Sequence, residues 1–399
     1  MTNSGVKTPF VAIACGGTGG HLFPGLAVAE QLKQQGCAVT LMVSPKEVDQ
    51  QAVKSAHGVA IVTLPAVALQ NRNYLSFAHS FWQSWGAARK MFKLRPPHAV
   101  LAMGGFTSAP PVLAAKKNGV KAFLHESNTI PGRANRFLAR FVDEVFVGFP
   151  EAAQRLKARK VTMTGTPVRP QFQLRDPGAC RTALGLDSDR SVILIMGGSQ
   201  GASGINELIL AMLPLLASRD SGWQWLHLTG TGHWEKVKQA YADQGLKAVV
   251  RPFLAEMDLA LGAATVAVSR AGASSLAEIA AMRLPSLLVP FPAAADNHQY
   301  HNARVFDATG AARLLEQKKA TPQDVVTILR ELAGNEATRT AMQTALAQWH
   351  APRAAEQIAE NILKACWSSS FSLPREKRLT SELQPFRSNE PKQSRVYAA

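Results

Sequence analysis

The 399-residue sequence predicts an α/β protein with two Rossmann-like, doubly wound domains that face each other across a cleft. Three observations predict this class. The chain is too long for one ordinary domain. Short apolar runs alternate with helical patterns, which is typical of parallel sheets covered by helices. Glycine-rich turns of one type recur in both halves of the chain, and the 46% of hydrophobic residues is enough to form large cores.

Short apolar runs predict six strands in the first half of the chain and five in the second. Strands are expected at 10–15, 38–43, 59–63, 99–102, 121–125 and 144–147, and then at 191–196, 223–228, 248–250, 265–269 and 286–289. Helical patterns lie between them, for example at 24–35, 205–216 and 274–282.

A glycine and two prolines interrupt this alternation at 164–170, where we expect the two domains to join. The expected division is a first domain at 1–168, a second domain at 169–342, and helices at 343–366 that return to the first domain. Residues 367–399 are rich in serine, proline and charge without periodicity, which predicts a disordered basic tail.

The net charge of +16 is unevenly distributed. Residues 1–170 contain 20 Lys and Arg against 7 Asp and Glu, whereas residues 171–366 contain 18 of each. Nucleic acid, an anionic membrane surface or a phosphorylated substrate would each explain a basic half. Because no nucleic-acid motif or base-stacking platform accompanies the charge, we expect no nucleic-acid partner.

The cysteines and the apolar runs indicate a cytoplasmic protein. The four cysteines form no CxxC pair, which argues against a disulfide framework or a zinc site. The N-terminus lacks a signal-peptide pattern, and no run approaches the length of a membrane-spanning helix.

The densest glycine run, Gly16-Gly-Thr-Gly-Gly-His21, follows a predicted strand and precedes a predicted helix. Glycines let backbone N–H groups approach an anion, and a helix N-terminus adds a favourable dipole, so this run predicts a phosphate cradle. It fits neither the dinucleotide fingerprint nor the Walker A loop. A tight turn needed only for packing is the alternative. His21 is a candidate general base, although a helix cap is the commoner role for such a histidine.

The second half repeats this strand–glycine–helix pattern in Gly197-Gly-Ser-Gln-Gly201, where Ser199 can donate its hydroxyl to a phosphate. Related turns occur at 100–108 and 267–275. Such turns at the carboxyl ends of parallel strands mark the ligand-binding edge of doubly wound folds.

Six runs together, in this order over about residues 8–366, resemble the MurG family, the GT-B-fold glycosyltransferases of peptidoglycan synthesis. The runs are Gly16-Gly-Thr-Gly-Gly-His21, Phe23-Pro-Gly-Leu-Ala27, His125-Glu-Ser-Asn128, Gly197-Gly-Ser-Gln-Gly-Ala202, Arg270-Ala-Gly-Ala-Ser-Ser-Leu-Ala-Glu278 and Asp296-Asn-His-Gln-Tyr-His-Asn302. The resemblance implies transfer of N-acetylglucosamine from UDP-GlcNAc to the C4 hydroxyl of the muramoyl sugar in undecaprenyl-pyrophosphoryl-MurNAc-pentapeptide (lipid I), which gives lipid II. The anomeric centre inverts. The resemblance further implies that the domain at 1–168 binds the acceptor and faces the membrane, and that the domain at 169–342 binds UDP-GlcNAc.

The resemblance also implies roles for individual residues. His21 is the candidate base, Glu278 binds the ribose hydroxyls, and the backbone of Leu254 reads the uracil. The full set expected to bind UDP-GlcNAc is Thr18, Gly19, Gly20, Asn128, Arg169, Ser199, Leu254, Ala273, Ser274, Ser275, Leu276, Ala277, Glu278 and Gln299, with Asn302 as a further sugar contact. Because no D-x-D pair lies beside these motifs, we expect no protein-bound metal and no cofactor.

The sequence departs from the family pattern at three positions. Ser127 stands where many relatives have Gln, Phe106 stands where Tyr is common, and His298 replaces a frequent Gln. These departures place fine contacts in question but leave the reaction unchanged.

An aromatic segment at 74–93 is a candidate membrane contact, because aromatic residues with flanking cations suit an anionic lipid surface. The patch residues are Phe77, Phe81, Trp82, Trp85, Arg89 and Lys90. A helix facing the core is the alternative. With a lipid-linked acceptor, this patch predicts a peripheral protein on the cytoplasmic face of the plasma (inner) membrane, where cell-wall synthesis or division proteins are candidate partners.

Two other functions remain open from the sequence. A non-hydrolysing UDP-GlcNAc epimerase has paired domains of the same kind and needs no lipid acceptor. A nucleotide-sugar-binding scaffold that has lost catalysis is the other, although the set of His21, Glu278 and Gln299 argues against it.

Overall fold

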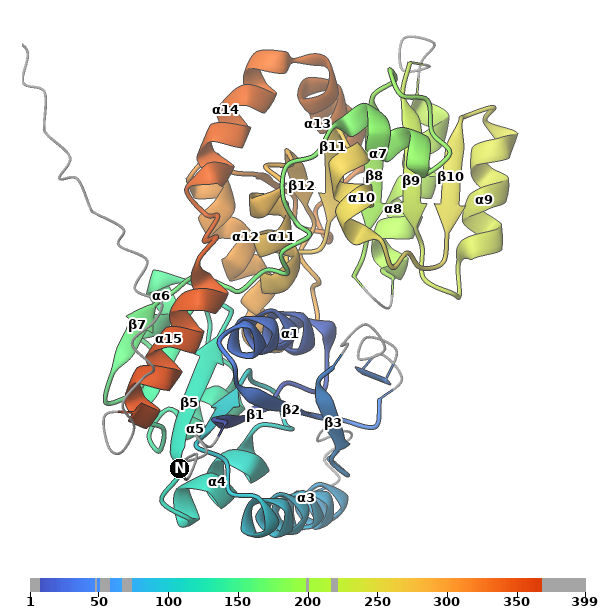
Figure 1. Cartoon of the computed structure of the whole chain (residues 1–399). Helices are drawn as coiled ribbons and strands as arrows, with labels where there is room; N and C mark the ends of the chain where they lie inside the picture. The colour runs from blue at the N-terminus through green and yellow to red at the C-terminus, as the bar shows by residue number, and fades with distance from the viewer. Residues whose placement is uncertain are drawn as a thin grey trace, which may run out of the picture.

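The structure is a computed structural model that describes residues 8–46, 49–50, 58–66, 74–198, 201–216 and 222–367. It contains two parallel α/β domains, which confirms the predicted fold class (Figure 1). The expected tail at 367–399 lies outside the described residues apart from Trp367.

The first domain has a seven-stranded sheet in the order β3-β2-β1-β4-β5-β6-β7, with every neighbouring pair parallel. Its strands are β1 Phe10–Ala14, β2 Ala38–Val43, β3 Ala60–Thr63, β4 Ala99–Ala102, β5 Lys121–Glu126, β6 Glu144–Val147 and β7 Val161–Met163. The strand order reverses next to β1, so the loops after β1 and β4 lie at the switch point where such sheets bind ligands.

Helices cover both faces of this sheet. One face packs against α1 (Gly19–Gln34) and α15 (Ala354–Trp367). The opposite face packs against residues of α3 (Tyr74–Leu94), α4 (Ala109–Lys117) and α5 (Arg133–Leu138), and α6 (Pro150–Ala153) follows β6. Although α15 follows the second domain in sequence, it lies against α1 of the first domain (Figure 1).

The second domain has a six-stranded sheet in the order β10-β9-β8-β11-β12-β13, also parallel. Its strands are β8 Val192–Met196, β9 Gln224–Leu228, β10 Ala248–Arg251, β11 Val266–Ser269, β12 Ser286–Leu288 and β13 Arg313–Leu314. Its helices are α7 Pro177–Ala183, α8 Ser203–Met212, α9 Trp234–Asp243, α10 Met257–Ala263, α11 Ala273–Ala281, α12 His298–Ala308, α13 Pro322–Gly334 and α14 Glu336–Ala347.

The predicted strands occur within one or two residues of their expected bounds, but two short strands, β7 and β13, were not predicted. They have three and two residues, too few for a periodic signal. The prediction that the first helix starts at residue 24 was wrong. Helix α1 begins at Gly19, because the last two glycines of the loop already adopt helical backbone conformation.

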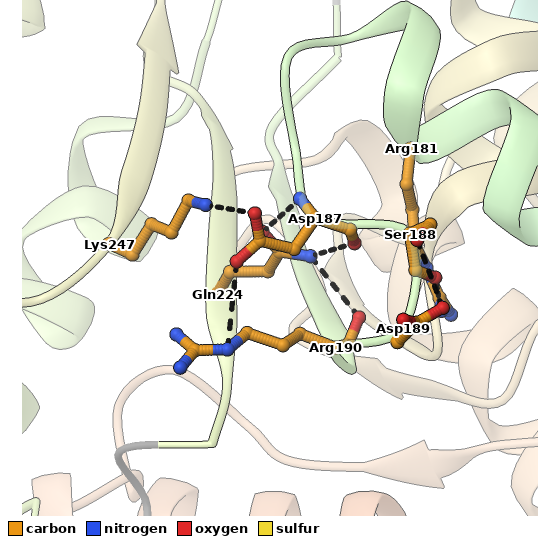
Figure 2. Close-up of polar contacts among 7 residues, drawn as sticks. All are labelled: Arg181, Asp187, Ser188, Asp189, Arg190, Gln224 and Lys247. Carbon is orange, nitrogen blue, oxygen red and sulfur yellow. Dashed lines mark hydrogen bonds and ion pairs between the residues drawn. The ribbon is translucent and has the colours of Figure 1, made fainter.

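A buried polar brace closes the amino ends of β8 and β9, at the sheet edge opposite the glycine-rich turns (Figure 2). The side chain of Gln224 is fully buried; its Oε1 accepts from the Asp187 N–H at 2.9 Å, and its Nε2 donates to the carbonyls of Asp187 at 2.6 Å and Arg190 at 3.2 Å. Lys247 and Arg190 form ion pairs with the Asp187 carboxylate at the surface.

We expect Gln224→Ala to lower the free energy of unfolding by about 2–3 kcal/mol, because three backbone groups lose their buried partner. Chemical denaturation measures this loss. Lys247→Ala is the matched control and should cost much less, since an exposed ion pair contributes little. Equal destabilisation by the two variants would contradict the brace.

Candidate functional site

The first glycine-rich turn, which we call loop 1 (Gly16–Gly20), connects β1 to α1. Gly17 has a φ of +107°, a conformation that favours glycine. Its N–H donates to Asp49 Oδ2 at 2.6 Å, and its carbonyl accepts from Lys46 Nζ at 3.2 Å. Thr18 is the N-cap of α1 and makes no side-chain cap bond, so the first-turn N–H groups of α1 have no side-chain acceptor from this position.

His21 lies in the first turn of α1, where Thr18 Oγ1 and His21 Nδ1 are 3.1 Å apart. The turn after β4 packs directly on its ring. A Cβ added at Gly104 would lie 2.9 Å from the ring and one at Gly105 would lie 3.1 Å from it, and both residues have positive φ. Burial lowers the pKa of His21 to about 4, against the opposing charge of Asp49. The imidazole is therefore neutral at pH 7 and able to accept a proton.

The motif His125-Glu-Ser-Asn128 ends β5 and is largely buried. His125 Nε2 lies 3.1 Å from the Gly165 carbonyl, and burial lowers the pKa of His125 to about 4. Burial also raises the pKa of Glu126, whose carboxylate accepts bonds from Asn128, Gly132 and Asn135. Glu126 thereby fixes the Asn128 side chain at the end of the strand.

Asn302 of α12 joins the two domains through this motif. Its Oδ1 accepts from the N–H and hydroxyl of Thr129 at 3.0 and 2.9 Å, and its Nδ2 donates to Asn128 Oδ1 at 3.0 Å and to the Ala271 carbonyl at 3.1 Å. Asn302 is fully buried. A direct sugar contact by Asn302 would require some of these bonds to break.

A second link joins Arg169, in the junction between the domains, to Glu278 of α11. Arg169 Nη2 lies 3.4 Å from Glu278 Oε1, and the side chains are only 15% and 12% exposed. The guanidinium also lies over Phe23 of α1 at 4.2 Å and over Phe172 at 4.8 Å from the ring centroids. Burial raises the pKa of Glu278 to about 7, and Arg169 opposes this rise. The carboxyl predicted to bind ribose thus sits beside a cation and next to α1.

The raised pKa of Glu278 predicts a pH dependence of stability. Between the ordinary carboxyl pKa of 4.5 and the raised pKa of about 7, the folded carboxyl binds more protons than the unfolded one, so its stabilising proton is lost as pH rises through 7. We expect Glu278→Gln to gain stability relative to wild type by roughly 2 kcal/mol between pH 5 and pH 8. Denaturation at both pH values measures this, and a pH-independent difference would contradict it.

Helix α11 presents the predicted donor-binding run at its N-terminus, after the Gly272 N-cap, and α11 contacts α1 across the domain interface. Ala273 and Leu276 are buried, whereas Ser274, Ser275 and Ala277 are partly accessible. The side chain of Arg270 donates to the carbonyls of Val289 and Pro290, which holds the turn before this helix.

The other predicted donor residues are more dispersed. Leu254 is buried beyond β10, and Gln299 Oε1 accepts from the Phe291 N–H at 3.0 Å, within its own domain. Gly19 and Gly20 form the start of α1. Ser199 lies outside the described residues.

The structure brings the predicted residues together in three contacts: Thr18 with His21, Arg169 with Glu278, and Asn128 with Asn302. Sequence reasoning missed Asp49, and it gave no role to Asp296, the first residue of the sixth run. Asp296 pairs with Arg136 at 2.7 Å across the domains, and nothing in a single sequence signals such a long-range partner. Asp49 follows β2 in a segment that matches no motif in the sequence.

The predicted membrane patch lies on α3, on the sheet face opposite α1 (Figure 1). Ser80, Ser84, Ala88 and Phe92 form its buried side, so the aromatic stripe is not the main core face. Trp82 is 63% exposed and Lys90 is exposed, whereas Phe77, Phe81, Trp85 and Arg89 are half-buried. Arg89 and Lys117 both lie over the Trp85 ring, at 5.3 and 5.5 Å. No helix of the described part of the chain is long and apolar enough to cross a membrane.

Two Rossmann-like domains, with α1 and α11 in contact at their interface, are typical of the GT-B glycosyltransferases. Comparison with known proteins supports this class. The glycosyltransferase family 28 N-terminal domain matches residues 11–147, and the family's C-terminal domain matches residues 192–358.

Two curated relatives are both named UDP-N-acetylglucosamine--N-acetylmuramyl-(pentapeptide) pyrophosphoryl-undecaprenol N-acetylglucosamine transferase. The one from Listeria welshimeri is 32% identical over 88% of this chain and 98% of its own length, and the one from Anaeromyxobacter sp. (strain K) is 35% identical over 91% and 96%. The crystal structure of Acinetobacter baumannii MurG is 27% identical, covers 90% of this chain and 99% of its own, and has a TM-score of 0.70. This chain belongs to the MurG family of GlcNAc transferases, within glycosyltransferase family 28.

The epimerase alternative shares the fold but is not favoured. A crystal structure of a UDP-N-acetylglucosamine 2-epimerase has a TM-score of 0.68 and 14% identity, covering 91% of this chain and 98% of its own. At that identity the likeness shows the fold alone.

Proposed function

We propose that this enzyme transfers GlcNAc from UDP-GlcNAc to the C4 hydroxyl of the MurNAc sugar in lipid I, which forms lipid II with inversion at the anomeric carbon. The observation that carries the proposal is the contact between two helices across the domains: α1, which carries His21, and α11, which carries Glu278, with Arg169 between Glu278 and Phe23 of α1. The names of the curated relatives support the same donor and acceptor.

The chemistry is a single displacement. Neutral His21 takes the proton from the acceptor C4 hydroxyl as its oxygen attacks the anomeric carbon. The bond between that carbon and the UDP oxygen breaks, and the electron pair leaves with UDP. The N-terminus of α11 stabilises the negative charge that develops on the diphosphate, through its dipole and its free N–H groups.

The remaining residues bind the donor. Glu278 accepts hydrogen bonds from the ribose hydroxyls, the backbone of Leu254 contacts the uracil, and Gln299 contacts the sugar hydroxyls. Arg169 pairs with Glu278 at 3.4 Å and places a cation beside the donor-binding carboxylate.

Incubation of the protein with labelled UDP-GlcNAc, with and without lipid I, tests the function. Transfer of label to lipid only when lipid I is present supports the proposal. Conversion of the donor without an acceptor would identify an epimerase, and binding without turnover would identify a scaffold.

We also propose that the α3 patch docks the protein on anionic lipid, at the cytoplasmic face of the plasma (inner) membrane. The basic first domain, exposed Trp82 and the cations around Trp85 support this, since aromatic side chains with flanking cations suit a membrane interface. Proteins of cell-wall synthesis or division remain candidate partners at that surface.

For the double variant Trp82→Ser/Lys90→Ser, we expect flotation with anionic vesicles to fall several-fold, because an interfacial aromatic and about 1 kcal/mol of charge attraction are lost. Wild-type binding should weaken with added salt and be absent with neutral vesicles. Lys236→Ser, which removes a charge from an exposed position on α9 of the other domain, is the control. Equal binding to both vesicle types would contradict this docking.

A further inference from the structure

Asp49 is a fully buried carboxylate directly beneath loop 1. Its Oδ2 accepts from the Gly17 N–H at 2.6 Å, from the Ser44 hydroxyl at 2.5 Å and from the Ser44 N–H at 3.2 Å. Its Oδ1 is buried without a hydrogen-bond partner among the described residues. Burying a carboxylate is costly, so this position needs a reason beyond packing.

The contacts of Asp49 converge on one residue of the loop. Asp49 holds the N–H of Gly17, and Lys46 Nζ holds its carbonyl at 3.2 Å. Lys46 also lies 5.2 Å from the ring centroid of Phe106, in the turn after β4. Both backbone polar groups of Gly17 are therefore fixed by charged side chains from the segment after β2.

Gly17 determines how the chain enters α1. It immediately precedes the Thr18 N-cap, and its φ of +107° turns the chain into the helix. Thr18 in turn contacts the ring of His21. A change in the Gly17 backbone would move the first-turn N–H groups and His21 together.

We propose that Asp49 is a positioning residue for sugar transfer, which holds Gly17, with Lys46 on its other side, and thereby sets the geometry of loop 1 and His21. The inference rests on the proposed transfer reaction. Asp49 itself touches no substrate in this scheme and acts through the loop.

The test compares Asp49→Asn with wild type under saturating lipid I and varied UDP-GlcNAc. We expect kcat to fall roughly 10- to 100-fold, since displacements of about 1 Å at a reacting group have effects of that size. The KM for UDP-GlcNAc should stay near wild type. Amide hydrogen exchange in the segment 16–20 should become faster. Unchanged kcat together with unchanged exchange would overturn the proposal, as would a parallel loss of melting temperature and donor binding.

Two further variants test the proposal even if Asp49→Asn does not fold. Lys46→Met removes the bond to the Gly17 carbonyl from a partly exposed position, and should lower kcat in the same way but less. Gln50→Ala removes a neighbouring side chain that bonds the Ser44 carbonyl and not Gly17, and should stay near wild type in kcat and in exchange. If Asp49→Asn does not fold, an unaffected Lys46→Met overturns the proposal. If wild type transfers no sugar, the proposed function fails, and hydrogen exchange still tests the role of Asp49 in the loop.

Discussion

Replacing His21 with alanine is expected to lower kcat by roughly 10²- to 10⁴-fold, the range for loss of a general base. The affinity for UDP-GlcNAc should change little, because His21 lies on α1 of the first domain and the donor residues belong mainly to the second domain. Because Thr18 and the Gly104–Gly105 turn hold the neutral ring in place, we expect no other side chain to take over its role as base.

Steady-state kinetics with lipid I, combined with calorimetric titration of UDP, separates turnover from binding in this variant. His79→Ala, an exposed histidine on α3, is the matched control and should retain wild-type kcat in detergent. Turnover near wild type in His21→Ala would place the base elsewhere.

Replacing Glu278 with alanine is expected to affect donor binding more than turnover, and therefore to raise the KM for UDP-GlcNAc. Hydrogen bonds to a charged group contribute about 1.5–3 kcal/mol each, so losing the ribose contacts should weaken donor binding by about 10- to 100-fold. The loss also leaves the Arg169 guanidinium without its carboxylate partner in a site where it is only 15% exposed.

Titration of UDP against Glu278→Ala measures this loss directly, and UMP and uridine separate ribose from diphosphate contacts. Glu331→Ala, which removes an exposed carboxylate from α13 of the same domain, is the control. An unchanged KM for UDP-GlcNAc would contradict the ribose role of Glu278.

Much of the fold could be predicted because its signals are local. The buried strands β1, β4, β8 and β11 are short apolar runs, each followed by a turn that contains glycine, since strands covered by helices on both faces have no polar side. The edge strands β7 and β13 could not be found this way. They are short and partly exposed, and they are strands only because a neighbour pairs with them.

The candidate site shows the same division. The glycine turns, His21 and Glu278 were found from residue type and order, because phosphate cradles and the family motifs are continuous in sequence. Asn302 was expected to contact sugar, but its partners Thr129 and Asn128 lie more than 170 positions away, and only the structure shows that its amide joins the domains. Asp49 carried no signal at all, since its role depends on a contact with Gly17 across β2.

The sequence by itself determined the two-domain class, the basic first half and the glycine-rich turns, because apolar periodicity, charge and backbone freedom are properties of neighbouring residues. Only the tertiary structure decided which charges face one another. Arg169 contacts Glu278 and Asp49 contacts Gly17, since these contacts form only when the two sheets and their helices pack. The net charge of the chain indicated an anionic partner, but burial set the pKa values of His21 and Glu278, and burial exists only in the fold.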